Sequence, residues 1–594
     1  MENNGSSTLT TSMMIKRFII MFIVTFSVGI IGTHTIFNSH QAIACSIFIA
    51  IIMGTLFFWN FRLAIAFLGV SVLILTNALD IETFVLSSTL EVILFLVGMM
   101  IIVGALKDLG FFTWVVQRIV AMPNITGRKF IVVTSLTSAF LACAVDEVTS
   151  IIFISTIIFH VSERLKISPL PYIIICVLCT NVGSAGTMMG NPVGIYIGTK
   201  AGLTFGDFMH WAFPLMVLAL MATVVVVMLY YRKELDLFDQ HLKERLDKNL
   251  SLITKVEVPY KEGLLLLTVT VLLISVHHQL ETWLGLGKNT ILLIAPLICA
   301  GIVMIVKRDR ARDYVEKEVD WWTLLFFMLL FSIAGTIEHT HVDKVIAEKF
   351  ALLCGTSLPS LVSFILFVSA IGSAFVDNVI FVAAFAPIVE QLSTSIQDLP
   401  LWWALLFGAC FGGNITMIGS TANIVALGML EKRSKIHVTF MQWFKVGFIA
   451  SIVACLVALV GILSLSPFMP DRYSNVSWTD FKGIQAERFQ DKNVHCQAKI
   501  GEVATYSIEK YPDQEYSCYK IYNIRQDYTS QDSTEQEYIY AYILKNTPQE
   551  EQLKNNHGKA LHIQAKASYH PESKEAYPVI LEIEKLKEIK KKDS

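Results

Sequence analysis

Residues 138–148 read SAFLACAVDEV, and residues 373–379 read SAFVDNV. Each stretch places an aspartate inside a long apolar segment that is expected to lie in lipid. A carboxylate in the bilayer costs from about 2.5 to more than 10 kcal/mol, so it persists where it faces a polar cavity or where a function requires it. Two such carboxylates in matching surroundings, Asp146 and Asp377, therefore predict a transport site.

The composition of the 594-residue chain is that of a membrane protein. Apolar residues make up 54% of it and charged residues only 16%, with a mean hydropathy of +0.57. Such values are typical of polytopic membrane proteins, so the lipid bilayer is the expected partner. The net charge of −2 gives no basis for nucleic-acid binding. No Gly-rich phosphate loop, zinc motif or nucleophile–base arrangement stands out, so neither an enzyme nor a resident cofactor is expected.

Nine apolar runs are candidates for single membrane spans of roughly 20 residues. They are 18–37, 42–59, 63–79, 84–106, 210–231, 262–277, 289–306, 320–340 and 442–466. Four further apolar segments carry Asp, Asn, Gly or Pro in the middle: 130–160, 171–199, 357–391 and 402–430. If 130–160 and 357–391 are re-entrant hairpins, and the other two are spans with unwound centres, the chain has eleven spans.

The distribution of Lys and Arg supports this topology through the positive-inside rule. With two hairpins, every loop rich in basic residues falls on one side, including 232–261 and 307–317, whereas the opposite connections 38–41, 80–83, 278–288 and 392–400 contain only Lys288. The chain is therefore predicted to lie in the inner or plasma membrane with a cytoplasmic N-terminus. The hairpins then enter from opposite sides, which is the inverted repeat of many secondary transporters.

The predicted fold class is an all-α polytopic membrane protein with a small β-rich soluble domain at the C-terminus. The expected parts are N-terminal spans 1–83, a first transporter repeat 84–231, a cytoplasmic loop 232–261, connecting spans 262–319, a second, inverted repeat 320–468, and the soluble domain 469–594. Alternating stretches in the last part predict about five strands, in a barrel similar to an OB-fold. This domain is expected outside the cytoplasm, where Cys496 and Cys518 can form a disulfide or remain two thiols.

Each hairpin is followed by a span that Gly, Asn and Thr interrupt. Broken helices expose backbone groups near the bilayer midplane, which is tolerable only where they line a cavity. The letters pair Asn181 with Asn414, and residues 187–190 with 416–419. The predicted binding residues are Asp146, Glu147, Asn181, Thr187, Asn191, Asp377, Asn378, Asn414, Thr416, Ser420 and Asn423. The predicted hinge or close-approach positions are Gly183, Gly186, Gly190, Pro192, Gly412, Gly413 and Gly419.

Asp146 and Asp377 are the first candidates to bind a transported metal cation or a proton. A carboxylate in such a place either holds a proton or stays ionised beside a cation, and both behaviours suit exchange at one site. The alternative is that each aspartate caps the second helix of its hairpin. Glu147 either titrates as a second group or faces away.

These motifs resemble the ion transporter superfamily, in the branch of arsenite permeases and NhaD-type sodium/proton antiporters, with citrate and dicarboxylate carriers as relatives. Residues 187–208 resemble the pattern T-x-x-G-D-P-P-N-I-x-I-G…G-L-x-F-x-D-F, residues 412–423 its second-half counterpart, and residues 377–379 the family's D-N-V. The resemblance covers about 84–466 and implies eleven spans, two opposed hairpins and a homodimer. The sequence departs from the pattern at Glu147, where Asn is usual, at Asn191, where Asp is usual, and at Val193-Gly194, which replace Pro-Asn.

Three functions remain open from the sequence. The first is a sodium/proton-type cation antiporter with Na⁺ or H⁺ as coupling ions, because acidic hairpin tips favour cations. The second is an anion permease for arsenite-like oxyanions or for citrate and dicarboxylates, in which the aspartates bind only the coupling ion. No Lys or Arg lies deep in the four broken segments to neutralise a polyanion. A remote third is a sensor or scaffold read by the C-terminal domain.

Overall fold

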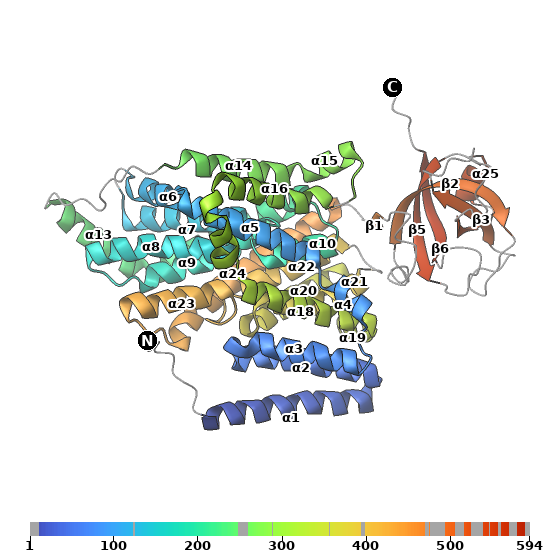
Figure 1. The fold of residues 1–594 in the computed structure, drawn as a ribbon, viewed down its shortest axis with the longest axis horizontal. Coiled ribbons are helices and arrows are strands. Elements are labelled where there is room, and N and C mark those ends of the chain that lie inside the picture. The colour runs from blue at the N-terminus through green and yellow to red at the C-terminus, as the bar shows by residue number, and fades with distance from the viewer. Residues whose placement is uncertain are drawn as a thin grey trace. The chain divides into compact units, whose positions relative to one another are not determined.

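The computed structural model contains two compact units: the first ends at Met469, and the second comprises the chain after it together with the short segment 394–399. It describes the following residues: 11–122, 125–247, 259–287, 289–355, 357–393, 398–469, 474–475, 493–504, 516–523, 538–545, 547–555, 560–569 and 579–588. The first unit consists of helices packed side by side, and the second is a small β-barrel (Figure 1).

The helical unit confirms the polytopic membrane fold. In the described part of the chain nine helices are long and apolar enough to cross a membrane, or eleven if each of two bent pairs is one span. The helices are α1 (Thr11–Thr35), α2 (Ser39–Phe57), α3 (Arg62–Leu75), α4 (Ile81–Ser87), α5 (Leu90–Asp108), α6 (Phe111–Val120), α7 (Gly127–Ala144), α8 (Glu147–Leu165), α9 (Leu170–Gly183), α10 (Pro192–Lys200), α11 (Phe205–Asp207), α12 (Phe213–Tyr230), α13 (Arg232–Asp247), α14 (Lys261–Ser275), α15 (His277–Leu284), α16 (Thr290–Val306), α17 (Ala311–Asp313), α18 (Trp321–His339), α19 (Val342–Cys354), α20 (Leu358–Phe375), α21 (Asn378–Leu392), α22 (Asp398–Gly412), α23 (Thr421–Ser434) and α24 (Phe440–Leu465).

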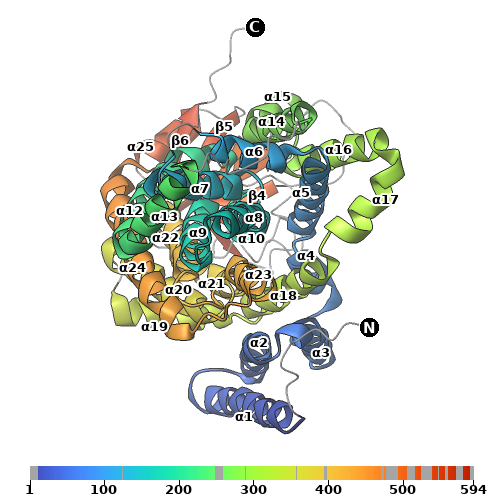
Figure 2. The same cartoon turned by 90° about the vertical axis from the view of Figure 1, so that its left-hand side faces the viewer.

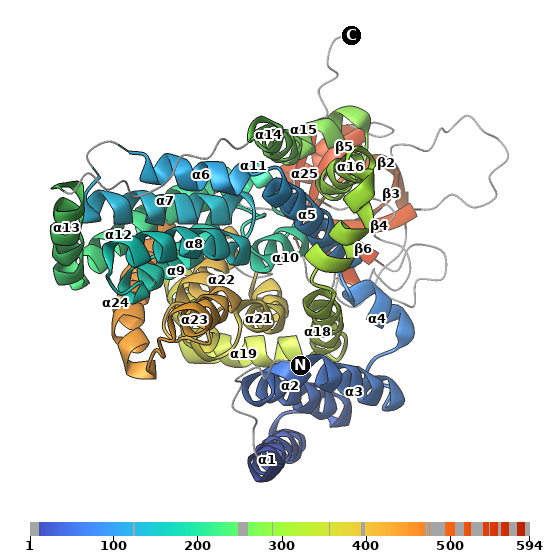
Figure 3. The same cartoon turned by 60° about the vertical axis from the view of Figure 1, so that its left-hand side comes forward.

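The α7–α8 pair is a hairpin that returns to the side it started from. At the start of α7, the backbone N–H of Gly127 donates to Asp239 of α13. At the end of α8, the carbonyl of Leu165 contacts the ring of His241, also on α13, at 2.8 Å. Because α13 touches both outer ends, the tip between the arms points into the unit (Figure 3).

The α20–α21 pair is the second hairpin, and its outer ends lie against α19. The hydroxyl of Ser360, near the start of α20, donates to the carbonyl of Cys354 at the end of α19. The ring of Phe350 on α19 lies 5.8 Å from that of Phe385 on α21. Both arms therefore begin and end on the α19 side of the unit.

The α13 and α19 sides are opposite ends of the bundle, as the broken span α9–α10 shows. Near the start of α9 the hydroxyl of Tyr172 donates to the carbonyl of Glu234 on α13. At the end of α10, Lys200 pairs with Glu338 at the end of α18 and with Glu390 near the end of α21. The α9–α10 span thus crosses from the α13 side to the α19 side.

The second broken span, α22–α23, runs in the opposite direction. It starts after α21, on the α19 side, and Arg433 near its end pairs with Glu163 near the end of α8, with 3.1 Å between Nε and Oε1. The two hairpins and the two broken spans are therefore related by inversion, as the sequence predicted. Viewed end-on, α8, α9 and α10 lie inside the bundle and α1 lies outermost, beyond α2 and α3 (Figure 2).

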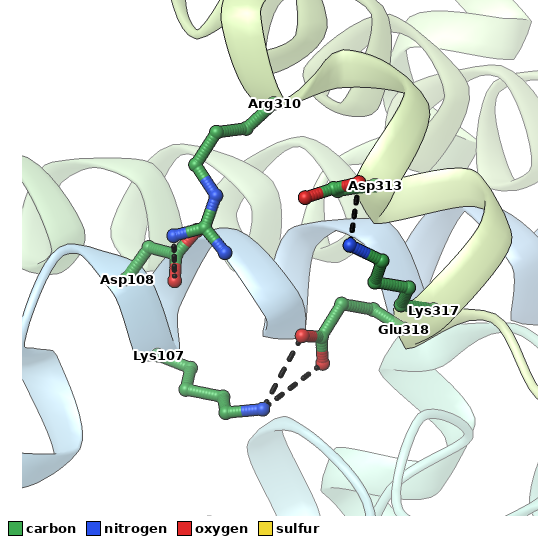
Figure 4. Close-up of polar contacts among 6 residues, drawn as sticks. All are labelled: Lys107, Asp108, Arg310, Asp313, Lys317 and Glu318. Carbon is green, nitrogen blue, oxygen red and sulfur yellow. Dashed lines mark hydrogen bonds and ion pairs between the residues drawn. The ribbon is translucent and has the colours of Figure 1, made fainter.

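A small ion-pair cluster joins the end of α5 to residues 308–318, which precede α18 (Figure 4). Its pairs are Lys107–Glu318, Arg310–Asp108 and Lys317–Asp313, with N–O distances of 3.2, 2.8 and 2.8 Å. Partly exposed pairs of this kind contribute little stability each. They hold the connection that leads into α18 against the end of α5.

The helices add two details to the expectations from the sequence. The predicted span 84–106 is divided into α4 and α5 at Thr89, whose φ of 44° is incompatible with a continuous helix. The predicted loop 232–261 contains the helix α13, while 248–258 lies outside the described residues. Polar helices at the ends of the bundle have no apolar run to reveal them.

The second unit has the strand order of an OB-fold, as predicted. Its strands are β1 (Ser474–Asn475), β2 (Asn493–Ala504), β3 (Tyr516–Asn523), β4 (Tyr538–Leu544), β5 (Ala560–Tyr569) and β6 (Val579–Glu588), with α25 (Pro548–Asn555) between β4 and β5. The order β2-β3-β4-β6-β5 closes through a β2–β5 pairing, and within this ring only β4–β6 is parallel. The side chain of Cys496 lies outside the described residues, so its disulfide stays a prediction. The β2–β3 register places Cys518 opposite Ala504.

Candidate functional site

Both hairpin tips carry their aspartate at the N-terminus of the second arm. Asp146 accepts hydrogen bonds from the backbone N–H of Thr149 at 2.8 Å and from its hydroxyl. Asp377 accepts from the backbone N–H of Val379 at 3.1 Å, and its other oxygen accepts from the hydroxyl of Thr421 at 2.7 Å. Each carboxylate is favoured there by the helix dipole. Asp146 is thus bound within its own hairpin. Asp377 instead connects its hairpin tip to the second break, which is the interruption between α22 and α23.

Two threonines attach the breaks to the hairpin tips in the same way in both halves. The hydroxyl of Thr187 donates to the carbonyl of Cys143, and the hydroxyl of Thr416 donates to that of Ala374. Each carbonyl lies three positions before the tip aspartate. These threonines, predicted as ligands, are therefore engaged in holding the tips.

The glycines of the breaks allow close packing. A Cβ on Gly183 would lie 2.5 Å from the Cα of Ala139, and one on Gly412 would lie 2.4 Å from the Cα of Ala370. None of the glycines in the two breaks, both of which are fully described, has a positive φ. Their backbone conformation is thus open to any residue, and the need for glycine comes from the approach of the hairpin.

These contacts correct the register of the internal repeat. Gly183 corresponds to Gly412, and Asn191 to Ser420, since each member of the second pair caps the helix after its break. At that spacing Asn181 corresponds to Cys410, and not to Asn414 as the letters indicated. The two asparagines are not equivalent, but they are direct neighbours.

Asn181 is the centre of a buried network between the two breaks. Its Nδ2 donates to Oδ1 of Asn414 and to Oδ1 of Asn423, both at 2.8 Å. Its Oδ1 accepts from the hydroxyl of Ser420 at 3.1 Å. Asn423 in turn donates to the carbonyl oxygens of Gly413 and Thr416, at 2.8 and 2.9 Å. Four polar side chains from the two inverted spans are therefore joined in one buried hydrogen-bond network.

Glu147 adds a charged group to this network that lacks full pairing. Its side chain is only 4% exposed. The hydroxyl of Ser420 lies 3.4 Å from Oε1, and Oε2 has no hydrogen-bond partner among the residues that the structure describes. Ser420 has one proton to share between Glu147 and Asn181, so even the Oε1 contact is partial. A buried carboxylate with a free oxygen requires a proton or a cation.

The surroundings of Glu147 suit a hard cation. Ser184 and Asn191 of the first break and Asp377 of the second hairpin all lie near enough to interact with its carboxylate. The oxygen atoms available there belong to carboxylates and hydroxyls, which are ligands that hard cations prefer, whereas Oδ1 of Asn191 already accepts from Gly194. Two carboxylates, one from each half of the molecule, can therefore share one cation or one proton.

The other predicted residues have mostly structural positions. Asn191 caps α10 by accepting from the backbone N–H of Gly194 at 2.8 Å, and its amide donates to Ser184. Asn378 is buried as the first residue of α21, and Pro192 begins α10. The remaining glycines follow the same packing rule. A Cβ would approach Met216 at Gly186, Ser184 at Gly190, Gly419 at Gly413, and Gly413 at Gly419, within 2.2 to 3.0 Å.

Sequence reasoning missed Thr421, whose hydroxyl holds Asp377. The feature that could have predicted it is its position as the first residue of α23, directly after the helix-capping Ser420.

The comparisons with known proteins identify the family. The sequence profile described as "Citrate transporter" matches residues 48–408, which is more than half of the chain. The chain belongs to the citrate transporter family. The matched region includes both hairpins and the first break, and it confirms the resemblance to the ion transporter superfamily. It also supports the assignment of this citrate transporter family member as a membrane transporter.

Two relatives of this family member are similar over most of the membrane part. A protein of Mycobacterium tuberculosis named as an uncharacterized transporter is 31% identical over 382 residues, which cover 62% of this chain and 85% of the relative. The human P protein is 26% identical over 445 residues, which cover 63% of this chain and 53% of that protein. Among solved structures, the YdaH transporter of Alcanivorax borkumensis matches with a TM-score of 0.45 and 13% identity, over 67% of this chain and 89% of that one.

Proposed function

We propose that this protein is a cation-coupled secondary transporter in which Glu147 and Asp377 together bind Na⁺ or H⁺. The observation that carries the proposal is the free Oε2 of Glu147, buried beside the network of the two breaks. A bound cation or proton would neutralise the negative charge of this buried oxygen. After its release the carboxylate would be buried without a partner, which is unfavourable. Exchange of the two ions at one site gives cation/proton antiport, the first candidate function.

The second candidate is cation-coupled transport of citrate or another small carboxylate. It is favoured by the description of the family to which the chain belongs. In this case the Glu147–Asp377 pair would hold the coupling ion, and the anion would bind nearby. Arsenite-like oxyanions belong to the same alternative.

Alternating access requires that the binding site is closed on one side of the membrane. On the α19 side, ion pairs of Lys200 hold neighbouring helices together. Lys200 bridges Glu338 at 2.6 Å and Glu390 at 3.2 Å, so it ties α10 and α21 to α18. We propose that these pairs hold the α19 side shut and separate when the site opens there. The basic loops make the α13 side cytoplasmic in this proposal, with the N-terminus inside and the C-terminal domain outside, in the plasma membrane. A homodimer is proposed on family resemblance alone.

Ion exchange in proteoliposomes with a trapped pH dye tests the function. We expect added Na⁺ or Li⁺ to collapse a preset pH gradient with the wild type and not with Asp377→Asn. Asp146→Asn should retain most of the exchange, since the hydrogen bonds of Asp146 stay within its own hairpin, to Thr149, whereas Asp377 is bonded to Thr421 of the second broken span. Glu163→Gln, on the same helix as Glu147 but more than half exposed, is the matched control. If no monovalent cation moves protons and none drives citrate uptake, the cation-coupled proposal fails.

A further inference from the structure

A cavity of about 420 Å³ lies beside the second break, where three separate parts of the chain meet. Trp59 and Arg62 come from the start of α3, Asp320 and Thr323 from the start of α18, and Thr421 from the start of α23. Because α18 ends on the α19 side, its start places the cavity toward the α13 side. Exposed and half-exposed residues form its rim, so the cavity opens at the surface of the helical unit.

Arg62 is the cationic group of this cavity, and its bonding is incomplete. Its side chain is only 5% exposed. Nη2 donates to the hydroxyl of Thr323 at 3.1 Å, and the guanidinium lies 3.8 Å from the ring centre of Trp59. Its Nε is buried and has no hydrogen-bond acceptor in the described ranges. A buried guanidinium with an unused donor calls for an anion.

Asp320 does not serve as that anion. Its Oδ1 accepts from the backbone N–H of Thr323 at 3.2 Å, and its Oδ2 accepts from the Thr323 hydroxyl at 2.7 Å. It thus caps α18, and within the part of the chain that is described it forms no ion pair with Arg62. It contributes negative charge to the rim, whereas the donors of Arg62 remain available inside.

The cavity is connected to the cation site by a single side chain. Thr421 lines its inner wall, and the hydroxyl of the same residue donates to Oδ2 of Asp377 at 2.7 Å. Arg62 is also close enough to Asp377 for their charges to interact. An anion held by Arg62 would therefore lie next to a cation held by Asp377, and each ion would offset the other's charge.

We propose that this cavity is a binding subsite for a small carboxylate, with Arg62 as the group that binds it. The subsite rests on the cation site proposed above, and it gives the anion of the second candidate function a place in the fold and a binding residue. A guanidinium offers parallel N–H donors that match the two oxygens of a carboxylate. The apolar faces of Trp59 and Ile424 can cover the carbon skeleton. This arrangement supplies the cationic group that the four broken segments lack.

Equilibrium binding to the full-length protein in nanodiscs tests the subsite, with citrate and succinate as probes and NaCl held constant. Tryptophan fluorescence is the readout, because Trp59 and Trp322 line the cavity. We expect Arg62→Gln to weaken binding by about ten- to a hundredfold, the worth of a charge-assisted hydrogen bond. Arg62→Lys should restore part of it. Arg308→Gln, which removes an exposed arginine elsewhere, should bind as the wild type does.

Na⁺-induced thermal stabilisation, measured on the same samples, separates this inference from the proposed function. We expect Arg62→Gln to keep the Na⁺ response while losing the carboxylate. Wild-type protein that responds to Na⁺ but binds neither citrate nor succinate would overturn the subsite alone. Equal carboxylate binding by wild type and Arg62→Gln would do the same. Carboxylate binding that depends on Arg62, in a protein with no Na⁺ or H⁺ response, would support the subsite and contradict the cation site.

Discussion

Replacing Glu147 by Gln removes a charge from the centre of the molecule while keeping the shape of the side chain. The unpaired Oε2 of Glu147 is buried. An unsatisfied buried group costs about 1–3 kcal/mol, and more when it is charged. Glu147→Gln should therefore make the Na⁺-free protein at least as stable as the wild type, and it should abolish any gain from added Na⁺.

The size of that gain follows from mass action. A ligand at a hundred times its dissociation constant stabilises the folded state by about 2.7 kcal/mol. With about 2 cal/mol/K of unfolding entropy per residue, this corresponds to a rise of about 3 °C in Tm for a unit of this size. We expect the rise in the wild type with Na⁺ or Li⁺ but not with choline, and no rise in Glu147→Gln.

The assay is thermal unfolding of purified protein in detergent, followed across an ion titration at pH 8. Glu163→Gln is the control, because Glu163 lies on the same helix and forms only a half-exposed pair with Arg433. It should show the full Na⁺ response. A Glu147→Gln variant that keeps a Na⁺ shift as large as that of the wild type would refute the assignment of Glu147 as a ligand.

Four further substitutions have defined outcomes. Gly412→Ala should lower the free energy of unfolding by about 1–3 kcal/mol, because its Cβ would meet the backbone of Ala370. Gly428→Ala, with nothing within 4 Å of the new Cβ, should raise it by up to about 1 kcal/mol, and chemical unfolding compares the two. Burial raises the pKa of Asp343, in the short helix α19 outside the spans, to about 7. The folded protein then keeps this proton to a higher pH than the unfolded chain, so stability falls from about pH 4 to pH 7. Asp343→Asn should raise Tm at pH 8 and much less at pH 5; an equal effect at both would contradict the pKa. Lys200→Gln should remove the ion pairs that hold the α19 side shut and increase labelling there by a thiol reagent at an introduced cysteine; unchanged labelling would contradict a closed side.

Much of the architecture follows from the sequence, because the features that determine it are local. An aspartate within an apolar run predicts a hairpin tip, and a Gly/Asn-rich interruption predicts a break in a span. Neither prediction requires contacts between distant residues. The inverted arrangement then follows from counting basic loops. The alternating strands of the tail were enough to predict a small barrel similar to an OB-fold.

The parts of the site that were mispredicted depend on contacts between distant segments. The letters aligned Ala139 with Ala374, whereas the packing of the break glycines equates it with Ala370. Glu147 and Asp146 are adjacent in sequence, and only the fold shows that the glutamate faces the network while the aspartate is bound by its own helix. Arg62 lies far along the chain from Thr421, so no local pattern could place them in one cavity.

Equilibrium binding of radioactive ²²Na⁺ to purified protein tests the central claim most directly, since it requires neither transport nor a known substrate. We predict saturable binding that protons compete away, that Glu147→Gln and Asp377→Asn each abolish, and that Glu163→Gln retains. Saturable binding that survives in both Glu147→Gln and Asp377→Asn would show that the cation is held elsewhere, and would contradict a shared site between the two halves of the molecule.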